Sequence, residues 1–213
     1  MDFPIISKDD PLYLASASPR RRRLLEQLRL PFRSRRSDIE EDMSGDKPSF
    51  GTLRLAEKKA KSILPLPQPG WVLGADTVVV LDRAILGKPE GYNEALSTLS
   101  LLSGREHRVI TGFCVLDPLG KTGHAEAVET LVRFRNLSRQ EVEAYIATGE
   151  PFGKAGSYAI QGIGAFMVEG ITGSYTNVVG LPLGALIKAL VAEGALRGFP
   201  LAQSLSGVGP QKE

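Results

Sequence analysis

The segment WVLGADTVVVLD (71–82) constrains the fold more than any other part of the chain. It is an apolar run rich in β-branched residues, which is typical of a buried central strand. One residue interrupts it, because Asp76 stands between Ala75 and Thr77. An unpaired ionised carboxylate in such a strand would carry a large free-energy cost. We therefore expect Asp76 to meet a metal, a cation or a strand end that opens to solvent; the alternative is a structural aspartate bonded to backbone amides.

The beginning of the chain predicts a strand, a loop and a helix in that order. Residues 12–17 (LYLASA) form a short apolar strand that breaks at Ser18 and Pro19. The following RRRRLLEQLRL places three leucines on one helical face. Pro19 suits the first turn of that helix, where its missing N–H has no partner to lose, and Ser18 suits the N-cap.

The same loop offers a site for polyphosphate. A helix N-terminus presents free backbone N–H groups and a favourable dipole, and Ser16, Ser18, Arg20 and Arg21 add hydroxyl and guanidinium donors. It is not a Walker loop, since G-x-x-x-x-G-K does not occur there. The simpler interpretation is that Ser18 only caps the helix while the arginines solvate its surface, and we expect Arg22, Arg23 and Arg29 to lie on solvated faces.

The remaining elements predict an α/β fold with a mixed sheet. Further strands are expected at PFRSRRS, in the hairpin-like AILGKP, at HRVITGFCVLD, at AEAVETLVRFRNL and at TNVV. Further helices are expected around LRLAEKKAKSIL, at NEALSTLSLLSG and near the end at GALIKALVAEG. Another helix begins at Ser138, which forms a capping-box pattern with Glu141. Antiparallel pairs and crossovers both occur in this order. A simple doubly wound parallel sheet is therefore not expected.

Charge points to a site for phosphate and metal rather than for nucleic acid. The net charge is only +2, from 26 Lys and Arg against 24 Asp and Glu, so the chain is not a polyelectrolyte. Eight arginines fall between Arg20 and Arg36, and an acidic cluster follows them in SDIEED. Glu40 or Glu41, brought near Asp76, would make an oxygen-rich site for Mg²⁺ held jointly with substrate phosphates.

Other residue types exclude several classes of site. The single Cys114 lies in an apolar run and is expected to be a buried hydrophobe, which excludes a disulfide framework. His107 and His124 have no neighbours at metal-ligand spacing, so a zinc site or a histidine-based triad is not expected. No signal peptide or membrane span is evident, and we expect a cytoplasmic protein without a membrane partner.

Taken together, the motifs resemble the Maf family of nucleoside triphosphate pyrophosphatases. The resemblance runs from about Leu12 to Leu190 and is carried by LYLASASPRRRRLLEQL, SDIEE, LAEKKA, VLGADTVVV, ILGKP, LSGREHRVITG, GKAGSYAIQG and GSYTNVVGLPL. It implies an α/β fold with an elongated mixed sheet, flanking helices and two lobes around a central cleft, similar to inosine triphosphate pyrophosphatases. It also implies a homodimer.

The resemblance assigns roles to individual residues. It implies a phosphate-binding set of Ser16, Ser18, Arg20, Arg21, Lys59 and Lys88. It implies that Glu41 and Asp76 hold a divalent cation, Mg²⁺ or Mn²⁺, and that Asp76 is the proton acceptor. Nucleoside triphosphate would then be cleaved to the monophosphate and pyrophosphate by water attacking the α-phosphorus.

Three positions resemble the dTTP/UTP type within the family: Arg20 after Ser-Pro, Thr77 after Asp76, and Gln161 in SYAIQG. The 7-methyl-GTP type, with tryptophan, glutamine and glutamate there, is the alternative. The chain departs from the family at Gly153 in EPFGKAG, where the family commonly has an acidic residue. The absence of that carboxylate would lower turnover or alter the metal preference.

The expected organisation is an N-terminal extension over 1–11, a single two-lobed domain over 12–197 and a flexible tail over 198–213. A second hypothesis, from a different class, is a septum-formation regulator that binds a partner or nucleic acid. The arginine-rich 20–36 segment supports it, but there are no interleaved aromatic residues and no recognisable helix-turn-helix motif. Nucleic acid is therefore not an expected partner.

Overall fold

A single mixed sheet organises the computed structural model, which describes residues 3–43 and 45–201. Its seven strands include six in the order β2-β1-β3-β5-β6-β7, with β4 paired to β3 beside that path. The bounds are β1 (Leu12–Ala15), β2 (Phe32–Arg35), β3 (Val72–Leu81), β4 (Ala84–Leu86), β5 (Glu106–Leu116), β6 (Thr122–Phe134) and β7 (Val168–Thr172). Strand β1 runs parallel to β2 and β3, and the other pairs are antiparallel. The elongated mixed α/β fold expected from the sequence is confirmed.

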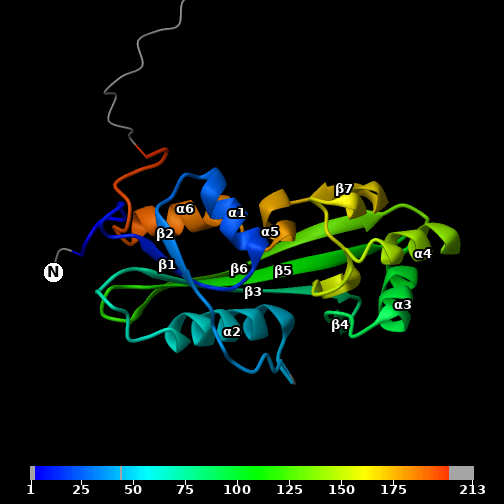
Figure 1. The fold of residues 1–213 in the computed structure, drawn as a ribbon, viewed down its shortest axis with the longest axis horizontal. Helices are drawn as coiled ribbons and strands as arrows, with labels where there is room; N and C mark the ends of the chain where they lie inside the picture. The colour runs from blue at the N-terminus through cyan, green and yellow to red at the C-terminus, as the bar shows by residue number, and fades with distance from the viewer. Residues whose placement is uncertain (1–2, 44, 202–213) are drawn as a thin grey trace, which may run out of the picture.

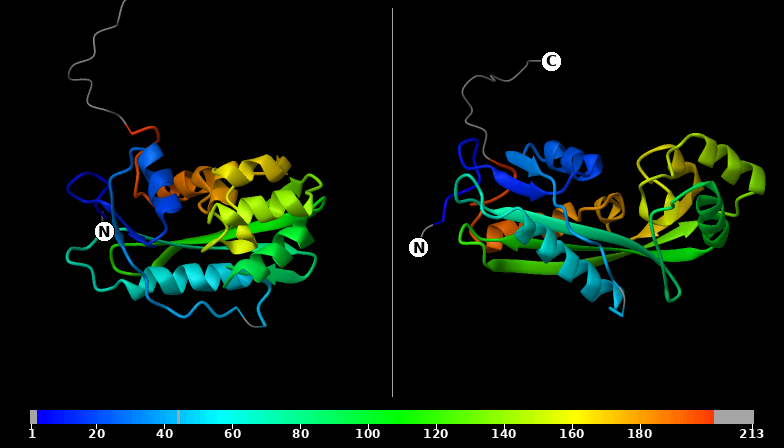
Figure 2. Two further views of the ribbon diagram at one scale, coloured as in Figure 1. Left: turned by 45° about the vertical axis from the view of Figure 1, so that its right-hand side comes forward. Right: turned by 60° about the horizontal axis from the view of Figure 1, so that its bottom comes forward.

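Helices cover both faces of this sheet. They are α1 (Pro19–Gln27), α2 (Pro48–Ser62), α3 (Tyr92–Leu102), α4 (Arg139–Ala147), α5 (Tyr175–Val179) and α6 (Leu183–Ala192), with short 3₁₀ turns η1 (Ala155–Ser157) and η2 (Ile163–Met167). Helix α2 lies along one face, while α1, α5 and α6 lie on the other (Figure 1). Helices α3 and α4 gather with β7 at the far end of the long strands, away from α1 and β2 (Figure 2).

Successive side chains of β3 point alternately to the two faces of the sheet. Odd-numbered Leu73, Ala75 and Val79 belong to the main core with α1 and α6, whereas even-numbered Val72 packs with Ala56 and Ala60 of α2. Both sets are almost fully buried. The prediction of a buried central strand at 71–82 is confirmed.

The edge of β3 that faces β1 and β4 is only partly paired. Val72 and Leu73 pair with β1, and Val79 to Leu81 pair with β4, whereas β5 pairs with the strand along the opposite edge from Val72 to Val80. Among the described strands, none pairs with the intervening segment 74–78 on that first edge. Strand β1 leaves the sheet after Ala15, which opens a window beside Asp76 and Thr77.

Two local expectations met different outcomes at helix starts. The capping box from Ser138 to Glu141 is present, with both reciprocal hydrogen bonds. Ser18 is the N-cap of α1 and Pro19 follows it, but the Ser18 side chain makes no capping hydrogen bond. Its hydroxyl is not committed to the helix.

The strand expected at TNVV is wrong. These residues belong to α5, because the Ser174 side chain accepts from the Asn177 N–H and caps a short helix. The fully buried Asn177 then donates from Nδ2 to the Val109 carbonyl and to Thr130 Oγ1. Tertiary hydrogen bonds thus override the β-preference of the two valines.

Both ends of the described chain pack against the sheet region. Ile6 N–H donates to the Ala195 carbonyl at 2.9 Å, and Trp71 Nε1 donates to the Pro4 carbonyl at 2.8 Å. The tail expected over 198–213 lies outside the described residues beyond Leu201, and the division into extension, two-lobed domain and tail stays a prediction. No helix in the described ranges is long and apolar enough to cross a membrane.

Candidate functional site

Two glycines allow α2 to lie close against the sheet. A Cβ on Gly74 would come within 2.0 Å of the Ala56 carbonyl oxygen, and one on Gly112 within 2.5 Å of the Thr52 carbonyl carbon. Gly112 is also the cross-strand partner of Asp76. This close approach carries the Lys59 side chain from α2 to the carboxylate of Asp76.

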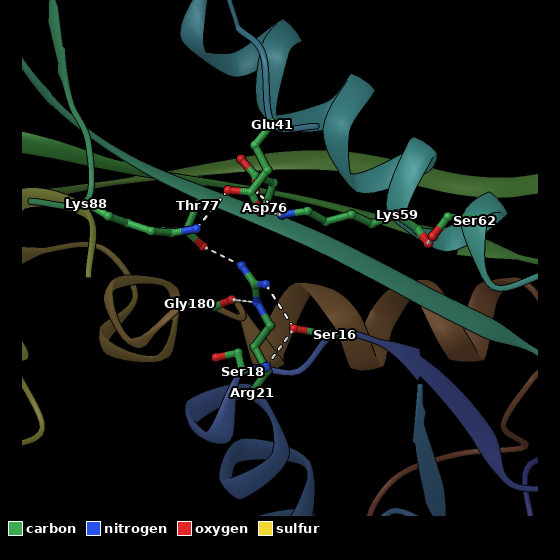
Figure 3. A network of polar contacts seen from close by, with 10 residues as sticks. All are labelled: Ser16, Ser18, Arg21, Glu41, Lys59, Ser62, Asp76, Thr77, Lys88 and Gly180. Carbon is green, nitrogen blue, oxygen red and sulfur yellow. Dashed lines mark hydrogen bonds and ion pairs between the residues drawn. The ribbon is translucent and has the colours of Figure 1, made fainter. Parts of the chain in front are cut away.

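The aspartate in the apolar strand is therefore paired with a cation. Lys59 Nζ lies 2.6 Å from Asp76 Oδ1 and 2.5 Å from Glu41 Oε1 (Figure 3). Asp76 is 6% exposed and Lys59 is 7% exposed, so their pairing offsets the cost of burying each charge. Lys88 Nζ, from the loop after β4, lies 2.8 Å from Glu41 Oε2. Two carboxylates and two ammonium groups thus form one cluster at the window in β3.

Glu41 is the more accessible carboxylate of this cluster. Burial on its own raises the pKa of the Glu41 carboxyl, but hydrogen bonds from Lys59 and Lys88 outweigh burial and lower the pKa to about 2. The side chain is ionised at neutral pH and faces two cations. Glu40, the other candidate in the acidic loop, is exposed and does not line the cavity.

The opposite face of the window is organised by Arg21. Its buried guanidinium donates from Nε to the Gly180 carbonyl at 2.8 Å, from Nη1 to Ser16 Oγ at 3.3 Å and from Nη2 to Thr77 Oγ1 at 3.0 Å (Figure 3). Burial lowers the pKa of Arg21. The side chain connects the loop before α1, strand β3 and the end of α5.

One cavity of about 380 Å³ joins the two faces. It is lined by every residue that the sequence assigned to the site: Ser16, Ser18, Arg20, Arg21, Glu41, Lys59, Asp76, Thr77, Lys88 and Gln161. Ser16 to Arg21 come from the β1–α1 region, and Gln161 comes from the glycine-rich segment near the other end of the sheet. The central cleft expected from the sequence lies between these parts, and the individual roles of its residues stay predictions.

The cavity also contains cations that the sequence did not single out. Arg36 is one of the eight arginines between Arg20 and Arg36, and Lys154 follows Gly153 in the motif EPFGKAG, and both line the cavity. The Lys154 ammonium donates to the backbone carbonyls of Glu150 and Phe152. Burial, and then repulsion from Arg20, lower the pKa of Lys154. The repeated basic positions around SASPRR and GKAG were the only signal that could have indicated them.

The loop that holds Lys154 is tied to the loop that holds Lys88. Gly156 N–H donates to the Gly87 carbonyl at 3.1 Å, and Gly156 has a φ of 70°, which favours glycine. Gly153 lines the cavity with a φ of 71°. The effect predicted for the missing acidic residue at this position stays a prediction.

The residues present fit a divalent cation only together with substrate oxygens. Glu41 and Asp76 already converge on one cationic atom, Lys59 Nζ. Within the described ranges, no three His, Cys, Asp or Glu residues are grouped as a metal site. Mg²⁺ usually combines one or two carboxylates with phosphate oxygens and water, so this pair is sufficient for it.

The residues excluded by the sequence lie elsewhere. Cys114 is buried, and burial raises the pKa of its thiol to about 11. His107 is buried and its Nε2 lies 2.9 Å from the Tyr158 hydroxyl, while His124 faces Glu126. Neither histidine lines the cavity. Arg22, Arg23 and Arg29 are exposed, as expected.

Comparison with known proteins agrees with the ordered motifs. The family model described as Maf-like protein matches residues 11–193. A protein of Syntrophotalea carbinolica named dTTP/UTP pyrophosphatase is 49% identical over 90% of this chain and 88% of its own length. Proteins of the same name from Ruminiclostridium cellulolyticum and Geobacter sp. are 49% and 48% identical over 82% and 89% of this chain, and over 92% and 98% of their own lengths.

A solved structure, a nucleoside-triphosphatase or dITP/XTP pyrophosphatase from Mycobacterium abscessus, aligns with 85% of this chain and 96% of its own at 13% identity and a TM-score of 0.39. That likeness is too low to bear on fold or function. The sequence matches extend over nearly the whole chain and include the residues around the cavity. The chain belongs to the Maf family.

Proposed function

We propose that this protein hydrolyses dTTP and UTP to the monophosphate and pyrophosphate. The observation that carries the proposal is the cavity itself, in which a carboxylate and lysine cluster faces a loop with arginine and serine donors across the open window of β3. Relatives that are 48–49% identical bear the name dTTP/UTP pyrophosphatase. Modified pyrimidine nucleotides of the same shape are further candidate substrates.

The residues divide into those that act on water and those that hold phosphate. Asp76, fixed by Lys59 in a nearly buried position, accepts the proton of the water that attacks the α-phosphorus. Lys59 and Lys88 offset charge that develops on the departing pyrophosphate. Ser16, Ser18, Arg20 and Arg21 surround the phosphates, with Arg21 acting through the groups that it positions.

We propose that Glu41 and Asp76 hold Mg²⁺ or Mn²⁺ together with the substrate. A divalent cation at this position supplies positive charge to the phosphate oxygens during cleavage. Lys59 must then share its two carboxylates, because both contact its ammonium group in the structure. The low pKa of Glu41 keeps this ligand ionised over the whole neutral range.

The direct test is a panel of nucleoside triphosphates with either metal, measured by release of pyrophosphate. We expect dTTP and UTP to be cleaved in preference to CTP, ATP, GTP and 7-methyl-GTP, and we expect a chelator to stop the reaction. Equal cleavage of purine nucleotides would contradict the specificity. Release of inorganic phosphate instead of pyrophosphate would contradict the position of bond cleavage.

Location and assembly are further parts of the proposal. We propose that the protein is a homodimer, which the family resemblance supports. We also propose that it is cytoplasmic, and the free thiol of the buried Cys114 supports a reducing compartment. Light scattering during gel filtration measures the mass in solution. A mass near the 23.0 kDa of one chain would remove the dimer from the proposal.

A further inference from the structure

The hydroxyl groups on either side of Arg21 can be assigned as donors or acceptors by counting protons. A serine or threonine hydroxyl has one proton to donate and two lone pairs to accept with. Arg21 can only donate, so every group that contacts its guanidinium must accept. Ser16 and Thr77 both accept from it and both line the cavity.

Ser16 is left with a proton. Its Oγ accepts from Arg21 Nη1 at 3.3 Å and from the Ser18 backbone N–H at 3.2 Å, which uses both lone pairs (Figure 3). Its own hydroxyl proton is not needed for either bond. Toward the cavity, Ser16 therefore acts as a donor, which suits a phosphate oxygen.

Thr77 is left with a lone pair. Behind it, Thr111 donates its only proton to the Asn177 carbonyl at 3.1 Å. The bond of 2.9 Å between the hydroxyls of Thr77 and Thr111 must then use the proton of Thr77. Arg21 Nη2 occupies one lone pair of Thr77, so the hydroxyl offers the cavity only an acceptor.

Thr111 and Asn177, which fix the orientation of the Thr77 hydroxyl, are themselves buried and hydrogen-bonded. Thr111 and Asn177 are both 0% exposed, and Asn177 is anchored by hydrogen bonds to Val109 and Thr130. Thr111 is the cross-strand partner of Thr77 between β3 and β5. A buried network with so many fixed partners leaves the Thr77 hydroxyl little freedom to reverse.

We propose that Arg21 and Thr111 are positioning residues that set the polarity of the cavity, presenting Ser16 as a donor to phosphate and Thr77 as an acceptor to an N–H or O–H of the nucleotide. The inference rests on the proposed function and deepens it. Uracil and thymine carry an imide N3–H, whereas cytosine has an acceptor at that position. A sugar hydroxyl is the other source of a donor.

Thr111→Val tests the network without changing any residue that lines the cavity. Removing the Thr111 hydroxyl frees the Thr77 proton to point at the ligand. We expect the ratio of kcat/KM for UTP over CTP to fall by about tenfold, the worth of one reversed hydrogen bond. Thr111→Ser keeps the hydroxyl and should keep the ratio.

Thr130→Val is the matched control. Thr130 is almost as buried and accepts from the Asn177 side chain. Without it Asn177 keeps its bond to the Val109 carbonyl, and the Asn177 backbone carbonyl can still accept from Thr111. We expect it to lower stability to a similar extent and to leave the UTP over CTP ratio unchanged. A normally folded Thr111→Val protein that keeps both the wild-type ratio and the wild-type discrimination against a UTP analogue without its 3′ hydroxyl would overturn the proposal. A Thr130→Val protein that loses the ratio to the same extent would also overturn it.

Two analogues with the wild-type protein identify the donor even where a variant does not fold. 3-Deaza-UTP lacks the N3–H, and 3′-deoxy-UTP lacks the 3′ hydroxyl, the one sugar hydroxyl that UTP shares with dTTP. We expect about a tenfold loss with 3-deaza-UTP if the base is read, or with 3′-deoxy-UTP if the sugar is read. Unchanged kinetics with both would contradict an acceptor role for Thr77.

The proposed function can fail separately. If the wild-type protein does not cleave UTP, affinities of the α,β-methylene analogues of UTP and CTP, measured by calorimetry, test the same polarity without catalysis. A preference for the UTP analogue that Thr111→Val removes supports the network. Equal affinities for these two analogues in the wild-type protein, together with an unchanged affinity for the α,β-methylene analogue of 3′-deoxy-UTP, would refute it.

Discussion

The carboxylate of Asp76 is accommodated inside an apolar strand because Lys59 reaches it from α2 at 2.6 Å. Asp76→Asn keeps the shape and removes the proton acceptor. We expect kcat to fall by about 10²- to 10⁴-fold, the usual contribution of a general base. Pyrophosphate release under saturating UTP measures the effect.

The control for this substitution is Asp82→Asn at the end of the same strand, where the side chain is 73% exposed and pairs with Arg105. It should retain full activity. Near-full activity in Asp76→Asn itself, with the fold intact, would show that the proton is accepted elsewhere.

His107 gives the fold a dependence on pH. Burial lowers the pKa of His107 from 6.5 to about 4, so between these values the unfolded chain binds the proton more readily than the native protein. Stability must therefore fall as the pH falls. We expect this group to remove about 2 kcal/mol of unfolding free energy between pH 7 and pH 5.

Urea denaturation of the wild-type protein and of His107→Phe at both pH values measures the contribution. The variant should lose less stability on acidification, since it has no imidazole to protonate. Parallel losses in the two proteins would mean that His107 does not titrate differently in the native and unfolded states.

At the scale of elements, the contact between α2 and the sheet sets the position of Lys59. Gly74→Ala would place a Cβ 2.0 Å from the Ala56 carbonyl oxygen and 2.8 Å from the Ala60 nitrogen, so α2 must shift. We expect a loss of about 2 kcal/mol or more in stability, as for overpacked cores, and a loss of activity as Lys59 moves.

Gly184→Ala in α6 is the comparison, because its added Cβ has no heavy atom within 4 Å and alanine favours helix. Thermal unfolding and UTP turnover should be read together. Unchanged turnover in a destabilised Gly74→Ala protein would show that the close contact of α2 with Gly74 stabilises the fold but is not needed to position Lys59.

The elements that could be predicted from sequence are those whose pattern is local. The apolar run of β3, the proline at the start of α1 and the capping box of α4 each act within a few residues. The segment TNVV misled because its helix depends on the Ser174 cap and on the long-range bonds of Asn177. Propensity alone does not contain that information.

The same division applies to the candidate site. Residues in contiguous motifs, such as Ser16 and Asp76, could be named because their side-chain chemistry is unusual where they occur. The role of Thr111 could not, since it follows from the register of β3 against β5 and from the orientation of one hydroxyl. Such roles become visible only when the donors and acceptors are counted in three dimensions.

The whole molecule has little net charge but a locally cationic cavity. Arg20, Arg36 and Lys154 line it, and in the described residues none of them forms an ion pair with a carboxylate. We expect pyrophosphate at about 100 times its Kd to stabilise the native state by about 2.7 kcal/mol. For a chain of this length, that raises the melting temperature by roughly 5 to 10 °C.

Differential scanning fluorimetry with and without pyrophosphate measures this shift. Lys154→Met should reduce it and high salt should weaken it, whereas Arg139→Gln on the exposed surface of α4 should leave it unchanged. No shift with the wild-type protein would argue against an anion site in the cavity.

The segment of β3 that is unpaired on its edge between β1 and β4 implies a trade-off between the stability of the fold and its activity. A longer β1 or β4 that paired with residues 74–78 would complete the ladder and add backbone hydrogen bonds, yet it would close the window through which Asp76 and Thr77 reach the cavity. Selection for activity therefore preserves a sheet with fewer paired residues than the most stable sheet of this topology would have. Variants chosen only for heat resistance are expected to extend β1 or β4 first, and to lose turnover in doing so.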